Sequence, residues 1–173
     1  MTTVTLTDSK QAQAEAIINK YVPWSMGAGF VPVPLLDVVA LTGIQLKMLS
    51  EISALYGVQF SENRGKSIVV SLLGGLGSTG LAAGVFGSLI KAIPGVGMWL
   101  GAATLPVIGG AITFAVGKIF VQHFESGGTF LNFDSMQARK AFAEKFEEGK
   151  KEAVALGQKV DAKLTKATAA VNL

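Results

Sequence analysis

The chain alternates between polar segments and unusually long uncharged ones. No acidic residue occurs between Glu62 and Glu125, and from Ser67 to Gly117 the only formally charged residue is Lys91. At 1.5 Å per residue in a helix, the uncharged runs 67–90 and 98–117 reach roughly 36 and 30 Å, against a hydrocarbon core of about 30 Å. Only KAIPGVG separates them. The pattern predicts a glycine-rich transmembrane hairpin over residues 67–117.

Pro106 lies near the middle of the second run. A proline there removes a backbone hydrogen bond and bends the helix. Such a bend is tolerated in a membrane when neighbouring groups satisfy the freed carbonyl. A re-entrant segment that enters and leaves on the same side therefore stays open as the alternative to a full return crossing.

The N-terminal part is polar. Residues 8–20 are good helix formers, with a modest apolar edge, and we expect a surface helix rather than disorder. That edge consists of Ala12, Ala16, Ile17 and Tyr21. The following stretch, VPWSMGAGFVPVP (22–34), holds three prolines, which predicts an extended apolar connector.

A second helix is predicted to open at Pro34 and to end at Gly57, where a left-handed cap costs glycine nothing. Its apolar positions recur at intervals of three and four, as in an amphipathic helix. They are Leu41, Ile44, Met48, Ile52 and Leu55. Ser61 is placed to cap the helix that leads into the hairpin.

The C-terminal part begins with an aromatic strip, residues 119–133, broken by two glycines. Asp134 and Gln137 have capping-box spacing for a last helix. Its apolar positions form a narrow seam, which packs against a partner helix in the same chain, against a copy or on the membrane. The seam consists of Phe142, Phe146, Ala153, Leu156, Val160 and Leu164.

We therefore expect an all-α membrane protein, in which amphipathic cytoplasmic helices flank the hairpin. It divides into a polar helix (1–21), a connector with an amphipathic helix (22–66), the membrane hairpin (67–117) and a C-terminal helical part (118–173). Basic residues gather outside the hairpin, and the positive-inside rule then places both termini in the cytoplasm of a bacterial inner membrane. The first residues have neither a basic start nor an apolar core, so we expect no cleavable signal peptide.

Composition supports a membrane protein and argues against most chemistry. Charged residues make up 16% of the chain and the mean hydropathy is +0.47, whereas soluble proteins average about 25% charged. Without cysteine, thiolate metal sites and cysteine nucleophiles are excluded, and one histidine argues against a histidine-built metal centre. No catalytic residue, cofactor or metal site is predicted, and a net charge of +3 without a basic stripe predicts no nucleic-acid partner.

One segment imitates a nucleotide-binding motif. Gly75, Gly77 and Gly80 have GxGxxG spacing after an apolar run. That fingerprint needs an acidic residue about twenty positions later to hold the ribose. The corresponding positions are Met-Trp-Leu (98–100), so nucleotide binding is rejected.

The same glycines suit helix packing in a membrane. Small residues four apart let helix backbones approach closely. The candidate packing positions exceed what one contact within a hairpin uses, which predicts a homo-oligomer. They are Gly80, Gly84, Gly87, Gly97 and Gly101.

Asp37 stands alone in an apolar stretch. A proton or ion site is one reading, and charge pairing with Arg64, Lys66 or Lys91 is the preferred one. Trp24 and Trp99 are expected to anchor the chain at the membrane interfaces, where amphipathic rings gather.

A family resemblance is carried by the segment from VPVPLLDVVALTGIQLKMLSEISALYG to SIVVSLLGG, followed by KAIPGVG and FVQHFESGGTFLNFD. In these segments the chain resembles the YcjF-like bacterial inner-membrane family, catalogued as domain of unknown function number 697. The likeness covers about residues 30–134. Members occur alone or attached to Era-like GTPase domains, so the resemblance implies a membrane location and a GTPase partner. Because GxxxxGK[ST] is absent from this chain, that GTPase would be a separate protein.

Three functions follow as hypotheses. The first is a non-enzymatic membrane protein that binds lipid, self-assembles through its hairpin and shapes membranes or acts as a scaffold. The second is an oligomeric pore lined by hydroxyl side chains. Those residues are Ser71, Ser78, Thr79, Ser88 and Thr113. The third is a regulator of a GTPase, which rests on the resemblance alone.

Overall fold

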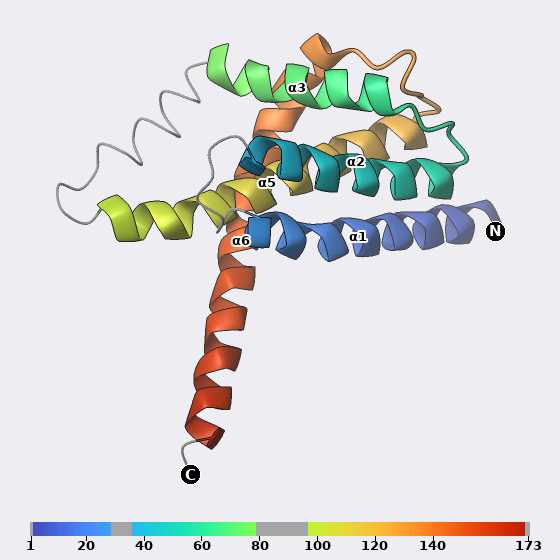
Figure 1. Cartoon of the computed structure of the whole chain (residues 1–173). Helices are drawn as coiled ribbons and strands as arrows, with labels where there is room; N and C mark the ends of the chain where they lie inside the picture. Colours follow the sequence, from blue (N-terminus) through green and yellow to red (C-terminus); the bar gives the residue numbers. More distant parts are fainter. Residues whose placement is uncertain (1, 29–35, 79–96, 172–173) are drawn as a thin grey trace.

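The computed structural model describes residues 2–28, 36–78 and 97–171. These residues form the helices α1 (Thr2–Ala28), α2 (Leu36–Tyr56), α3 (Glu62–Ser78), α5 (Gly97–Glu125) and α6 (Ser135–Val171). Figure 1 shows α1, α2, α3 and α5 lying alongside one another, whereas α6 crosses them and runs on past them. The predicted all-α class is confirmed over the described residues.

Contacts between helices fix their directions. Ser25 contacts Thr113, and Glu15 contacts Lys118, so α1 and α5 are antiparallel. Tyr56 reaches Glu125 at the end of both of their helices, so α2 runs parallel to α5. One end of the bundle therefore carries the loops 57–61 and 126–134, and the other carries the last turn of α3 and the first turn of α5 (Figure 1).

The core is built around the second half of α5. From Ile108 to Phe124 nearly every α5 side chain is buried, and α1, α2 and α6 pack around it. Phe120, Phe142 and Phe146 are the largest fully buried side chains. Burying an apolar side chain of this size contributes roughly 1.5–3 kcal/mol, which makes α5 the centre of the fold.

The predicted extended connector is wrong over residues 22–28, because α1 continues through Pro23 to Ala28. A proline inside a helix removes one backbone hydrogen bond and crowds the carbonyl four residues earlier, at a cost of about 3 kcal/mol. Val22 before it and Ser25 after it are both buried, so packing of α1 in the core offsets the lost bond. The remaining residues assigned to the connector, 29–34, lie outside the described residues.

The buried face of α1 also differs from the predicted edge. Ala14, Ile18 and Val22 are buried at intervals of four, together with Tyr21, whereas Ala12 and Ala16 are exposed. The short alanines gave too weak a pattern to orient this helix from sequence.

Other predictions are confirmed. In α2, Met48 and Ile52 are buried and the other predicted apolar positions pack against the core. Gly57 follows the helix with a φ of 70°, the left-handed conformation expected of a glycine cap. Asp134 Oδ1 accepts from the backbone N–H groups of Met136 and Gln137, so it caps α6 as predicted.

Two glycines let backbones approach without an intervening side chain. A methyl group on Gly149 of α6 would lie 2.8 Å from the carbonyl oxygen of Ala111, and one on Gly109 of α5 would lie 2.9 Å from that of Ser25. A backbone oxygen cannot rotate away as a side chain can. The crossing of α5 with α6 and with α1 therefore requires glycine at these positions.

We expect Gly149→Ala to destabilise the protein and Gly157→Ala to stabilise it. Both lie in α6, where alanine gains up to about 1 kcal/mol in helix propensity. At Gly157 the nearest atom to a new methyl group is 3.9 Å away, so only that gain applies. At Gly149 overpacking costs about 1–3 kcal/mol, which outweighs the gain in helix propensity. Denaturant unfolding in detergent checks the pair; equal stabilisation of both variants would contradict the close crossing.

Candidate membrane-directed end

Four helices of the bundle change from charged to uncharged at one level. The last charged residues before the uncharged stretches are Lys20 on α1, Lys47 on α2, Lys66 on α3 and Lys118 on α5. We call these four the lysine level. Lys20, Lys47 and Lys66 are exposed, and Lys118 is partly buried.

Packing contacts place these lysines side by side. A methyl group on Gly117 would lie 2.6 Å from Ile18 and 3.3 Å from Met48, so α5, α1 and α2 meet one or two residues from their lysines. A methyl group on Gly65 would lie 3.1 Å from Leu46, which aligns α3 with the same part of α2. The four lysines therefore mark one plane across the bundle.

Beyond the lysine level the described parts of these four helices carry one charged residue, Asp37 in the first turn of α2. The charged helix α6 crosses them there, beside Gly110 and Ala111. Residues 21–28, 38–46, 67–78 and 97–117 contain no Asp, Glu, Lys or Arg. We call this part, which carries the last turn of α3 and the first of α5, the uncharged end. Within it Trp24 is 68% exposed and Val70 is 55% exposed, although both are large and apolar.

Polar contacts hold the helices together on the charged side of this plane. Glu51 accepts from Lys20 Nζ at 3.0 Å and from Tyr21 Oη at 2.7 Å, which joins α2 to α1. The bond from the Tyr21 hydroxyl, followed by that from Lys20, holds the pKa of the Glu51 carboxyl below its ordinary value of 4.5.

Two further contacts complete these links. The ammonium of Lys118 pairs with Glu15, joining α5 to α1. Tyr56 Oη donates to Glu125 at 2.9 Å, joining α2 to α5, and burial of its ring raises the pKa of that phenol. Each of the three helices is thus tied to the other two above the lysine level.

A buried polar chain lies below that level, inside the uncharged end. Ser25 Oγ donates to the carbonyl of Tyr21 at 3.2 Å, and Ser25 and Thr113 hydroxyls lie 2.7 Å apart. Gln45 Nε2 donates to Thr113 Oγ1 at 3.5 Å. Because the Ser25 proton is already used, Thr113 donates to Ser25 and accepts from Gln45. The chain connects α2, α5 and α1, and leaves Gln45 Oε1 without a partner among the described residues.

Among the described residues, one stretch has the length and composition of a membrane span, residues 106–125 of α5. Most of it is buried within the bundle. The second half of the predicted return crossing (98–117) is therefore mostly enclosed by other helices and does not face lipid. Hydropathy alone could not separate a core helix from a span, because both are apolar.

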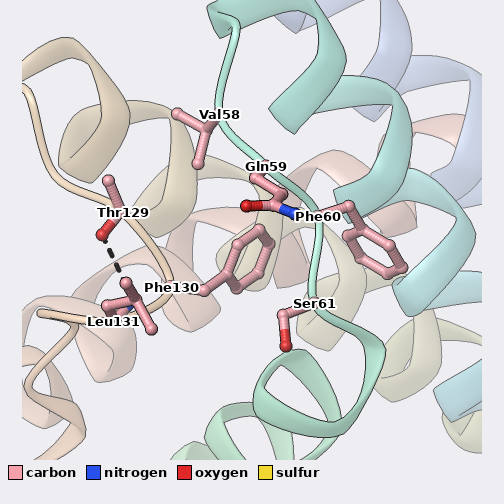
Figure 2. A pocket seen from close by; sticks show the side chains of 7 residues that line it. All are labelled: Val58, Gln59, Phe60, Ser61, Thr129, Phe130 and Leu131. Carbon is pink, nitrogen blue, oxygen red and sulfur yellow. Dashed lines mark hydrogen bonds between the residues drawn. The ribbon is translucent and has the colours of Figure 1, made fainter.

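One open hollow of about 400 Å³ lies between the loop after α2 and the loop after α5, at the opposite end from the uncharged one. Figure 2 shows its side chains; Phe60 and Phe130 are in edge-to-face contact, and Leu131 N donates to Thr129 Oγ1. Its lining includes no titratable side chain, so it offers no acid–base chemistry. The described residues likewise contain no group of three metal-binding side chains.

Several predicted site residues remain untested. Gly80, Gly84, Gly87 and Lys91 lie outside the described residues. Gly97, Gly101 and Trp99 fall in the first turns of α5, and Asp37 in the first turn of α2, but their surroundings are not described. Arg64 and Lys66 are exposed on α3 and form no ion pair with a described residue.

The proposed pore lining is partly used inside the chain. Thr113 belongs to the buried polar chain, and Ser71 Oγ lies 2.8 Å from Ser135 Oγ, which joins α3 to α6. The sequence reasoning missed Gln45, Gly109 and Gly149 as interhelix contacts. The signal that could have found them is a polar or minimal residue within an apolar helix stripe.

Comparisons with known proteins agree with the predicted resemblance. A family described as domain of unknown function (DUF697) matches residues 3–151, further on both sides than the expected 30–134. The chain is 45% identical over 150 residues to magnetosome membrane protein 22 of Magnetospirillum gryphiswaldense, a match that covers 87% of this chain and 75% of that protein. No solved structure matches it.

We expect the acid sensitivity of the fold to depend on Glu51. Because its folded pKa is lowered, Glu51 contributes stability above pH 4.5, which is lost as pH falls through its folded pKa. Glu51→Gln should be less stable than the unmodified chain at pH 7, with a difference that narrows as pH falls below 4.5. Thermal unfolding of both proteins, from pH 7 to below pH 4.5, measures this stability difference.

Glu147→Gln is the matched control, because the partner of Glu147 among the described residues is Lys150 of the same helix. It should follow the unmodified chain at every pH. If the stability difference between Glu51→Gln and the unmodified chain stayed constant from neutral to acidic pH, the ionised carboxylate would not have the role described here.

Proposed function

Because the chain belongs to the DUF697 family, and the related magnetosome protein is named as a membrane protein, we propose that it is a membrane protein inserted by its uncharged end. The lysine level carries this proposal. Lysines at a bilayer surface keep their ammonium groups among headgroups while their aliphatic stems cover apolar surface. Four helices that keep only Asp37 as a charged residue beyond one plane, within their described parts, match a protein entering a hydrocarbon layer.

Two further features support this orientation. Residues 79–96, which lie between α3 and α5 in the sequence, contain Lys91 as their only charged residue. Exposed Trp24 lies on the same side of the lysine level, where tryptophan suits an interface. The charged side, with the loops 57–61 and 126–134, then faces the cytoplasm.

We propose a non-enzymatic role as a membrane scaffold that self-associates through the glycines of its apolar hairpin. The GxxxG pairs Gly80–Gly84 and Gly97–Gly101 support this, since lipid-exposed helices associate by close backbone approach. A GTPase partner follows from family context alone. The pore alternative gains no support, because Ser71 and Thr113 already bond across helices within one chain.

The membrane proposal is tested by washing membranes at alkaline pH, which strips peripheral proteins. The chain is expected to remain in the pellet, and its release into the wash would overturn the proposal. The self-association proposal is tested separately by the mass of the detergent-solubilised protein. Gly84→Leu with Gly101→Leu should lower that mass to the monomer.

Gly43→Leu is the matched control, because Gly43 is exposed on α2 with no atom within 4 Å of a new methyl group. It should leave the mass unchanged. An unchanged mass in the double leucine variant would overturn self-association through the hairpin, while leaving the membrane location intact.

A further inference from the structure

Two lysines of the lysine level lie beside each other on neighbouring helices. A methyl group on Gly65 of α3 would lie 3.1 Å from Leu46 of α2, and the next residue along each helix is Lys66 or Lys47. Both lysines are exposed, and neither forms an ion pair with a described residue. We call Lys47 and Lys66 the lysine pair.

The other two lysines of that level already have carboxylate partners. Lys118 pairs with Glu15, and Lys20 donates to both carboxylate oxygens of Glu51 at 3.0 Å. Glu51 is thereby held on the side of α2 that faces α1, away from α3. Glu62, one turn before the lysine of α3, is exposed towards the charged side and is not ion-paired with it. The positive charge of the lysine pair is therefore left for an external anion.

An exposed uncharged surface adjoins the lysine pair. One turn beyond the pair, on the side of the uncharged end, are Gly43 on α2 and Val70 on α3; both are exposed. Ala40 and Gly74 lie a further turn along their helices and are exposed as well. We call these four residues the α2–α3 face. Positive charge and uncharged surface thus follow each other along both helices.

Helix α6 leaves this face uncovered, although it carries many charged residues. It meets α3 through Ser71 and Ser135, whose hydroxyl oxygens lie 2.8 Å apart. Ser71 lies on the flank of α3 turned away from Lys66, because five residues of a helix span about 140° beyond a full turn. Lys66 and Val70 stay exposed with α6 in place. The α2–α3 face is therefore open to a ligand from outside the chain.

A phospholipid has the two chemical parts that this surface would contact, a phosphate headgroup and an apolar acyl chain. We propose that the lysine pair binds the headgroup of a phospholipid with net negative charge, whose acyl chain lies along the α2–α3 face. The inference rests on the membrane location proposed above and adds the class of lipid. Lysine at a membrane surface attracts anionic lipids, whereas a choline headgroup carries a cation that offsets the attraction.

Charge also favours a lipid over a second copy of the chain at this face. Two copies packed through the same face about a two-fold axis would bring their lysine pairs towards each other. Like charges brought together at an interface weaken association. An anionic lipid instead supplies the missing negative charge and the apolar surface in one molecule.

The test is native mass spectrometry of the full-length protein in detergent, titrated with phosphatidylglycerol or phosphatidylcholine. Phosphatidylglycerol, which is anionic, should bind more tightly. Lys47→Gln with Lys66→Gln should weaken its binding roughly 25-fold, about fivefold for each lysine, and leave phosphatidylcholine binding nearly unchanged. Val70→Ser should weaken the binding of both lipids by a similar factor, because the acyl chain is common to them.

Lys10→Gln with Lys140→Gln removes the same charge from exposed positions on α1 and α6, and should bind phosphatidylglycerol as the unmodified chain does. Equal binding of the two lipids, equal weakening in the two double variants, or displacement of the lipid by excess inorganic phosphate would overturn the proposal. The alkaline wash tests the membrane location separately. A chain that stays in the pellet but does not distinguish the two lipids overturns this inference alone.

Discussion

The close approach of α5 to its neighbours is the constraint on which the rest of the structure depends. At Gly109 and Gly149 the helix meets a backbone carbonyl of its neighbour directly, and at Gly117 the side chains of Ile18 and Met48 pack against the bare backbone. These crossings bring Glu15 to Lys118 and Ser25 to Thr113. They also set the relative heights of the helices, because a shift of one turn would bring side chains into contact with a backbone oxygen.

The relative heights of the helices bring charged residues that are far apart in the sequence to one level of the bundle. Along the sequence, Lys20, Lys47, Lys66 and Lys118 are four unrelated residues, but in the folded chain they share one level. The links around Glu51 and Glu125 lie on the charged side, where water competes for them. The polar chain through Thr113 lies on the other side, fully buried, and uses neutral groups that an apolar environment tolerates when they are hydrogen-bonded.

Sequence reasoning succeeded where one strong local signal decided the outcome. The left-handed glycine at Gly57, the Asp134 cap and the seam through Phe142 and Phe146 each depend on a few neighbouring residues. It failed where tertiary packing decided. Pro23 was expected to end a helix that burial of Val22 and Ser25 sustains, and residues 106–117 were assigned to lipid although other helices enclose them. Apolar composition predicts burial, but it does not distinguish protein from lipid as the surrounding medium.

In the proposed orientation the lysine level coincides with the membrane surface. The most direct measurement of this placement is the depth of spin labels on single cysteines along the exposed side of α3, at Asn63, Val70 and Gly74, in lipid bilayers. We expect Asn63 to be accessible to a water-soluble relaxation agent. Val70 and then Gly74 should be progressively more accessible to oxygen, which concentrates in the hydrocarbon. Equal access of the water-soluble agent to all three positions would contradict this placement.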